Sequence, residues 1–213
     1  MDKVYNGIVI FGEMGAGKDA LADQFCILRD NAKIYKISLL CREMMKVSKV
    51  NQRWRGQERH IGQTIADRFR ELDINIMCDY ILALIYENGQ KKYGWNNSSL
   101  DEEAFNNSIL EQLNIMRNDE LSLIVGGRTL TDLEYWKSKN YLIVGVKVSD
   151  EVRKKRLITR DGIEVVKNSS SEHNTEVDVP YIIKNLCHEV IVNDGTLDDL
   201  KASAENLLVK YSF

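Results

Sequence analysis

The pattern of apolar and polar positions predicts strands that alternate with helices. Residues 4–11 form an apolar run, and residues 19–30, which follow a glycine-rich turn, carry apolar residues at helical spacing. Long uninterrupted apolar runs later in the chain are typical of strands that a parallel sheet buries on both faces. We expect further strands at residues 32–40, 121–127 and 141–149, and a strand, a turn and a helix within residues 188–208.

Helical and polar segments lie between these strands. Ile61, Ile65, Phe69 and Leu72 recur on one face of a long region at roughly residues 59–86, which predicts helical structure there. Glycine and asparagine make residues 88–107 an exposed loop that leads into a helix. We further expect a helix from residue 131, a basic helix at residues 151–162 and a polar loop at residues 168–178.

Composition narrows the classes of protein. The 213 residues suffice for one α/β domain with a full core. With 29 basic and 32 acidic residues, the net charge of −3 is too balanced to suggest a nucleic-acid polymer or an anionic membrane as the obligatory partner. No apolar run reaches the length of a signal segment or a membrane span, so we expect a cytoplasmic protein. The four scattered cysteines are expected to be buried, reduced thiols.

The stretch GEMGAGKD, at residues 12–19, has the pattern of a phosphate-binding loop. Its glycines let successive backbone N–H groups and a helix N-terminus point at one anion, and Lys18 adds a mobile positive charge. The position after a strand and before a helix is the context that such a loop requires. The alternative is a glycine turn with a solvent-facing lysine.

Asp19 stands where these loops usually carry serine or threonine. The hydroxyl at that position normally binds Mg²⁺, and Mg²⁺ accepts carboxylate oxygen as well, directly or through water. Asp19 also favours the helix N-terminus through the helix dipole. The two roles are compatible, and we expect Asp19 to be the metal ligand.

A loop that ends in Gly-Lys-Asp resembles that of the phage and bacterial deoxynucleoside monophosphate kinases, a branch of the adenylate-kinase-like P-loop enzymes. Later segments resemble the same family in the same order. Residues 59–73 are similar to its acceptor-binding helix, and residues 124–128 (IVGGR) to a strand end that carries an arginine. Residues 151–162 are similar to its arginine-bearing lid helix, residues 173–176 (HNTE) to a segment after the lid, and residues 190–200 to its terminal strand and helix.

This resemblance implies a three-layer α/β P-loop fold. Its central, mostly parallel sheet would have about five strands, with helices on both faces and a small helical lid. The chain would be a single kinase domain over residues 1–213. Within it we expect an acceptor-binding helical region at about 39–87, a polar insert at about 88–107 and the lid at about 153–177.

Two residues depart from the family pattern. Gly126 occupies the position where the family's strand offers an aspartate to the metal, and Ala20 lacks a hydroxyl that often follows Gly-Lys-Asp. If catalysis survives these departures, Asp19, the nucleotide phosphates and water must hold Mg²⁺ largely by themselves. The departures also fit a protein that binds nucleotide and turns it over poorly.

Phosphoryl transfer brings many negative charges together, so arginines must converge on the site. Arg156 and Arg160 lie four apart on one predicted helix, with Arg153 on nearly the same side. The alternatives are a solvated basic helix, a salt bridge from Arg128 to Asp132, and a position of Arg70 at the rim of the core. His173 and Glu176 are expected in lid closure or ribose contact.

The sequence therefore predicts an ATP-dependent kinase that uses Mg²⁺ and acts on a small phosphorylated acceptor, such as a (deoxy)nucleoside monophosphate. The alternatives are a phosphomevalonate or dephospho-coenzyme A kinase-like enzyme, a nucleotide-binding regulatory protein, and an ATPase coupled to a partner. We expect small-molecule nucleotides as partners, and the sequence leaves open whether the protein forms a homodimer. The expected catalytic residues are Lys18, Arg128, Arg156 and Arg160, the nucleotide-binding residues are Gly12, Glu13, Met14, Gly15, Ala16, Gly17, Lys18, Asp19 and Ala20, and the acceptor-binding residues are Arg42, Arg59, Gln63, Arg70 and Arg128.

Overall fold

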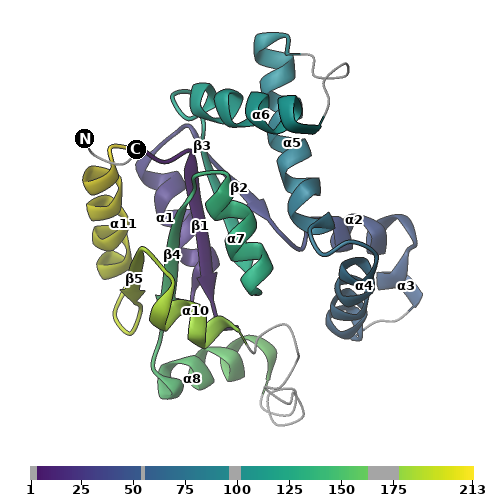
Figure 1. The fold of residues 1–213 in the computed structure, drawn as a ribbon. Coiled ribbons are helices and arrows are strands. Elements are labelled where there is room, and N and C mark those ends of the chain that lie inside the picture. Colours follow the sequence, from purple (N-terminus) through teal and green to yellow (C-terminus); the bar gives the residue numbers. More distant parts are fainter. Residues whose placement is uncertain (1–3, 54–55, 96–101, 163–177) are drawn as a thin grey trace. The chain divides into compact units, whose positions relative to one another are not determined.

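The computed structural model describes residues 4–53, 56–95, 102–162 and 178–213 (Figure 1). The chain forms two compact units. We call Met1–Ile34 with Leu113–Phe213 the sheet unit, and Tyr35–Gln112 the helical unit. The single kinase domain and the sub-regions expected from the sequence stay a prediction.

Five strands form one sheet in the order β2-β3-β1-β4-β5. The pairs of β1 with β3, β1 with β4, and β4 with β5 are all parallel. This order and direction confirm the α/β class and the mostly parallel sheet of about five strands. The strands are β1 (Gly7–Gly12), β2 (Ala32–Lys36), β3 (Leu121–Gly127), β4 (Leu142–Lys147) and β5 (Glu189–Val192).

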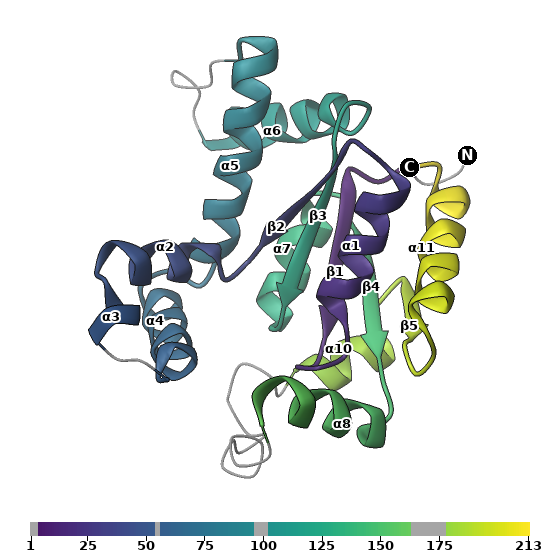
Figure 2. The same ribbon diagram turned by 180° about the vertical axis from the view of Figure 1, so that it is seen from behind.

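Helices cover both faces of the sheet in the sheet unit. Helices α7 (Leu130–Ser138) and α10 (Val179–Asn185) lie on one face, and α1 (Lys18–Leu28) and α11 (Leu197–Tyr211) lie on the other, as the front and back views show (Figures 1 and 2). Helix α8 (Asp150–Asp161) follows β4. The sequence pattern missed α10, because a helix of seven residues is too short to establish a periodicity.

The core of the sheet unit follows from the apolar runs. Every residue of β1 is buried, and so are Leu121–Val125 of β3 and Leu142–Val146 of β4. Each fully buried large aliphatic side chain contributes about 1.5–3 kcal/mol relative to exposure. The central strands therefore stay fixed, and the loops after them have a rigid base.

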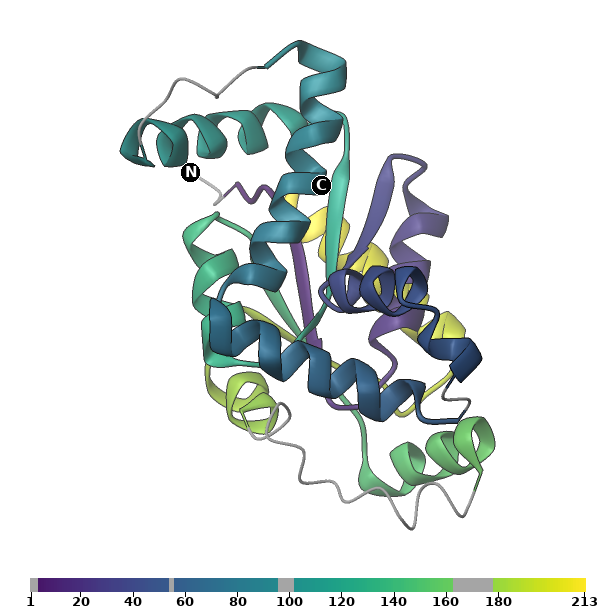
Figure 3. The ribbon, with the colours of Figure 1, turned by 90° about the vertical axis from the view of Figure 1, so that its right-hand side faces the viewer.

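The helical unit contains α2 (Leu39–Val47), α3 (Val50–Arg53), α4 (Glu58–Leu72), α5 (Ile76–Tyr93) and most of α6 (Glu102–Met116). Figure 3 shows α5 running from the α2 and α4 end of this unit toward α6. The region over 59–86 is helical, as expected, but it consists of two separate helices, α4 and α5. Asp73 is extended, and its carboxylate accepts a hydrogen bond from the backbone N–H of Asn75 at 2.8 Å. This turn ends α4 and competes with helix continuation.

The polar segment from residue 88 also differs from expectation. Helix α5 continues through residues 88–93 and ends at Gly94, which has a φ of 71°. A left-handed glycine at this position is a common helix terminator. Trp95 then stacks on Tyr93, with 4.7 Å between ring centroids. The remainder of the expected loop, residues 96–101, lies outside the described residues.

The four cysteines carry free thiols, but only Cys41 and Cys78 are buried. Cys26 and Cys187 are half-buried, so the expectation of four buried thiols was too broad. Among the described residues, no helix combines the length and apolarity needed to cross a membrane. A cytoplasmic location stays a prediction.

Candidate phosphate-binding site

The loop between β1 and α1 has the backbone that an anion cradle needs. Gly15 and Gly17 have φ values of 82° and 95°, in the left-handed region that favours glycine. The N–H of Ala16 donates to the carbonyl of Glu13 at 3.1 Å and closes a turn inside the loop. Helix α1 begins at Lys18, and the first backbone N–H groups of a helix point out of its N-terminus, where they can bind an anion.

Lys18 is buried, with 9% of its surface exposed. Its ammonium donates to the carbonyls of Gly12, at 2.5 Å, and Glu13, at 2.9 Å. A solvent-facing lysine is therefore not what the structure shows. The two carbonyl oxygens therefore hold the positively charged ammonium of Lys18 inside the loop.

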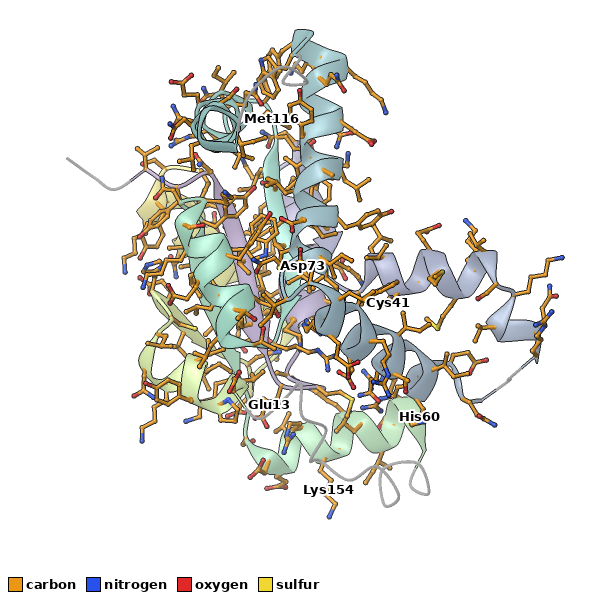
Figure 4. The ribbon with its side chains drawn as sticks, turned by 45° about the vertical axis from the view of Figure 1, so that its right-hand side comes forward. Glu13, Cys41, His60, Asp73, Met116 and Lys154 are labelled. Atoms are coloured by element: carbon orange, nitrogen blue, oxygen red, sulfur yellow. The ribbon has the colours of Figure 1, made fainter. Side chains whose placement is uncertain are left out.

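Helix α8 packs against the same loop. A guanidinium nitrogen of Arg153, Nη1, lies 3.2 Å from Oε1 of Glu13. A Cβ atom placed on Gly15 would come within 3.0 Å of the Leu157 side chain, so α8 approaches the loop as closely as glycine permits. Lys154 points away from the loop on the far side of α8, whereas Glu13 lies on the near side (Figure 4).

Arg156 turns toward the loop from α8. Its Nη1 atom lies 3.7 Å from the position of a Cβ atom on Gly17. Within the part of the chain that the structure describes, this nitrogen is buried and makes no hydrogen bond. Buried N–H groups nearly always have acceptors, so an unsatisfied guanidinium nitrogen beside a phosphate loop indicates room for an anion.

Asp194 adds a carboxylate near Arg156. Its pKa is lowered, mainly because the backbone N–H of Ser149 donates to it at 2.7 Å, and the charge of Arg156 contributes. Arg160 lies four residues beyond Arg156 on α8 and is exposed. The two arginines therefore differ in burial, although their spacing predicts one shared face of the helix.

The structure adds one residue that the sequence analysis did not single out. Asn193 follows β5 and is 5% exposed, and its Nδ2 atom donates to the carbonyl of Ala16 at 2.8 Å. Its backbone N–H donates to the carbonyl of Lys147 at 2.8 Å. The available signal was a polar residue directly after a buried strand, at the edge where parallel sheets bind ligands.

Asp19 lies in the first turn of α1 and is exposed. Among the described residues, no group of three or more histidine, cysteine, aspartate or glutamate side chains could hold a metal ion. One carboxylate with phosphate oxygens and water suits Mg²⁺, which prefers oxygen ligands and retains several waters. The residues present would therefore fit a Mg²⁺ ion bound together with phosphate groups. The role of Asp19 as its ligand stays a prediction.

Arg128 follows β3 at the same sheet edge as the loop, because β1 and β3 are parallel neighbours. Asp132 is almost fully buried, and its Oδ2 atom accepts from the backbone N–H groups of Arg128, at 2.9 Å, and Thr129, at 3.2 Å. Thr129 Oγ1 accepts in turn from the N–H of Asp132. Asp132 is thus part of the capping box of α7, which fixes the backbone at Arg128.

Gly126 sits in an irregularity of the pairing between β1 and β3. Ile10 pairs with Val125 and Phe11 pairs with Gly127, so Gly126 is the extra residue. Its φ of 101° disfavours any L side chain. The missing strand-end acid is therefore linked to a backbone conformation that suits glycine.

The expected acceptor residues of the helical unit lie on α2 and α4. Arg59, Gln63 and Arg70 share one face of α4, since their spacing of four and seven residues is helical. Arg59 and Arg42 are exposed, and Gln63 and Arg70 are half-buried. Burial raises the pKa of the Cys41 thiol, and the charge of Arg70 opposes that shift. His173 and Glu176 lie outside the described residues.

No protein-family model and no curated protein matches this chain. Solved structures with a similar arrangement include shikimate kinase from Bacteroides thetaiotaomicron, at 14% identity and a TM-score of 0.46, covering 97% of this chain and 98% of that one. Shikimate kinase from Acinetobacter baumannii, in complex with shikimate, has 13% identity and a TM-score of 0.43, with 98% and 94% covered. TT1252 from Thermus thermophilus has 16% identity and a TM-score of 0.49, with 96% and 97% covered. Likeness at this level is too weak to indicate an activity.

Proposed function

We propose that this protein is an ATP-dependent kinase that transfers the γ-phosphoryl group to a small phosphorylated acceptor, a (deoxy)nucleoside monophosphate. The observation that carries this proposal is the buried Arg156 Nη1, which lies beside Gly17 of the phosphate loop and has no acceptor among the described residues. A triphosphate oxygen would supply that acceptor. The resemblance of the loop and of later segments to deoxynucleoside monophosphate kinases supports the class of acceptor.

The chemistry needs positioned charge more than a base. An oxygen of the acceptor phosphate attacks the γ-phosphorus, and the bond to the bridging oxygen of ADP breaks. Lys18 and Arg156 would stabilise the charge that develops on the transferring group. Asp19 would hold Mg²⁺, which neutralises phosphate charge when bound. The ion pair of Arg153 with Glu13 keeps α8 against the loop, and α8 would help to exclude water from the site.

The test is release of ADP from Mg-ATP with each common nucleoside and deoxynucleoside monophosphate. The same panel includes phosphomevalonate, dephospho-coenzyme A and the unphosphorylated nucleosides. We expect one monophosphate to stimulate release strongly, and its matched nucleoside to have no effect. Stimulation by phosphomevalonate or dephospho-coenzyme A alone would replace the proposed acceptor and leave the kinase proposal intact.

Two lysines provide a matched pair of variants. Lys18→Ala removes the buried charge in the loop and should lower stimulated turnover about 100-fold or more, as loss of a transition-state donor does. Lys154→Ala removes an exposed charge from the far side of α8 and should leave turnover unchanged. Equal activity of the two variants would contradict a phosphoryl-transfer site at this loop.

A second candidate function is a nucleotide-binding regulatory protein, and the backbone at Gly126 favours it. The strand-end acid is absent, and the positive φ disfavours any side chain at that position. Tight binding of ATP with no stimulation by any acceptor would support this function. Hydrolysis that is indifferent to every acceptor would instead indicate an ATPase coupled to a partner.

A further inference from the structure

We infer that Asn193 is a positioning residue for the phosphate loop. It holds the loop in the conformation that binds a nucleoside triphosphate. This inference rests on the proposed function and names a residue that determines its geometry. The central contact is the hydrogen bond of 2.8 Å from Asn193 Nδ2 to the carbonyl oxygen of Ala16, and it is buried. The two residues are 177 positions apart in the chain, so the contact exists only in the folded protein.

Because a peptide bond is planar, the contact with the Ala16 carbonyl also fixes the direction of the Gly17 N–H. The carbonyl of Ala16 and the N–H of Gly17 belong to one planar trans peptide, in which the two groups point in opposite directions. Asn193 holds the carbonyl from one side and so directs the Gly17 N–H to the other side. If this peptide rotated, a carbonyl would replace the N–H in the cradle and repel a phosphate oxygen.

The surroundings of the contact leave little freedom. A Cβ atom on Gly17 would lie 2.1 Å from Asn193 Nδ2, so the side chain and the loop backbone are in direct contact. Asn193 is itself held by its backbone N–H, which donates to Lys147 at the end of β4. The loop is thus fixed to the rigid sheet through two successive hydrogen bonds.

Affinities for ligands with different numbers of phosphates test the inference. Isothermal titration calorimetry would give the Kd of adenosine, ADP and ATP for the full chain and for Asn193→Ala and Asn193→Asp. We expect both variants to lose about tenfold or more in affinity for ATP, the size of one hydrogen bond to a charged group. Their affinity for adenosine should change by no more than about twofold. Asn193→Asp should lose more, because a carboxylate accepts but cannot donate to the Ala16 carbonyl.

The ratio of ATP affinity to adenosine affinity is the decisive quantity, because it does not depend on the fraction of folded protein. Asn193→Asp nearly preserves volume, so a change of ratio in that variant cannot be attributed to a cavity. Asn6→Ala is the matched control. Asn6 is also buried, and its Nδ2 donates to the carbonyl of Lys139 at 2.9 Å, at the opposite end of β1. This control should lose stability and keep the ratio.

The outcomes separate the inference from the proposed function. If the unmodified protein binds ATP no more tightly than adenosine, the phosphate site is absent and both fail. If its affinity rises with each phosphate and the Asn193 variants show the same rise, only the role of Asn193 is overturned. Equal losses for adenosine and ATP would show a purely structural residue and would overturn it as well.

Discussion

Arg153 Nη1 lies 3.2 Å from Oε1 of Glu13, so an ion pair joins α8 to the phosphate loop. Both side chains are largely shielded, with 23% and 32% of their surfaces exposed. The pair places a carboxylate in a loop that would bind phosphates, and it neutralises that carboxylate. The arrangement keeps α8 close to the site while it limits repulsion between Glu13 and a nucleotide.

Arg153→Ala should therefore weaken ATP binding, because the charge of Glu13 then faces the phosphates alone. For a partly exposed pair we expect a loss of about two- to fivefold in affinity. Glu13→Gln in the same background should restore most of the loss. The four affinities form a double-mutant cycle, and additive losses from the two substitutions would contradict the pairing in solution.

Asp19→Ala should reduce Mg²⁺-dependent turnover more than nucleotide binding, since the carboxylate is expected to act through the metal. We expect turnover to fall by about tenfold or more while ATP affinity in the absence of Mg²⁺ stays within about twofold. Asp23→Ala, an exposed substitution one turn further along α1, is the control. Equal losses of turnover and binding in the Asp19 variant would indicate a structural role.

Gly126→Ala should destabilise the protein by about 1–2 kcal/mol, because an L residue is strained at a φ of 101°. Among the described atoms, a Cβ on Gly126 would meet nothing within 4 Å, so strain and not a clash causes the loss. Gly126→Asp should be destabilised to a similar degree. The free energy of unfolding from denaturant titration measures both.

Gly62→Ala is the contrast for this prediction. Gly62 lies inside α4, and among the described atoms a Cβ there would approach the flexible end of Met45 alone. Alanine is favoured over glycine in a helix interior by roughly 0.5–1 kcal/mol, so this variant should gain stability. A Gly126→Ala variant as stable as the unmodified protein would mean that the backbone at β3 is not constrained.

Cys187 should make the protein less stable at alkaline pH. Burial raises the pKa of this thiol to about 12, against an ordinary value of 9.0. The folded state therefore keeps the thiol neutral while the unfolded state ionises, so its contribution is fully present below pH 9.0 and is lost toward pH 12. The slope is at most about 1.4 kcal/mol per pH unit, reduced by screening because the thiol is half-exposed.

The free energy of unfolding, measured by urea titration at about pH 8 and about pH 10, gives the contribution of Cys187. The unmodified protein should lose more stability between the two than Cys187→Ala does. Other buried groups, such as Tyr141, whose pKa burial also raises, titrate in both proteins and cancel in the comparison. Identical losses would show that Cys187 ionises equally in the folded and unfolded states.

The sequence by itself determined most of the strands, although the strand expected at residues 32–40 ends at Lys36 and Leu39 begins α2. Apolar runs predicted β1, β3 and β4, and the spacing of Gly15, Gly17 and Lys18 predicted a phosphate-binding loop, because both depend on residues that are close together in the chain. The sequence pattern predicted the structure less well where a turn and a helix compete for the same residues. The helix-prone region at residues 59–86 divides into α4 and α5 at Asp73, whose carboxylate accepts a hydrogen bond from the N–H of Asn75.

Only the tertiary structure decided how the site is supported. Asn193 reaches Ala16 across 177 residues, Arg153 reaches Glu13 from another element, and Gly126 takes its conformation from the pairing of β3 with β1. No spacing within the sequence encodes these contacts. They arise because parallel strands bring the loops that follow them to one edge of the sheet, whatever their separation in the chain.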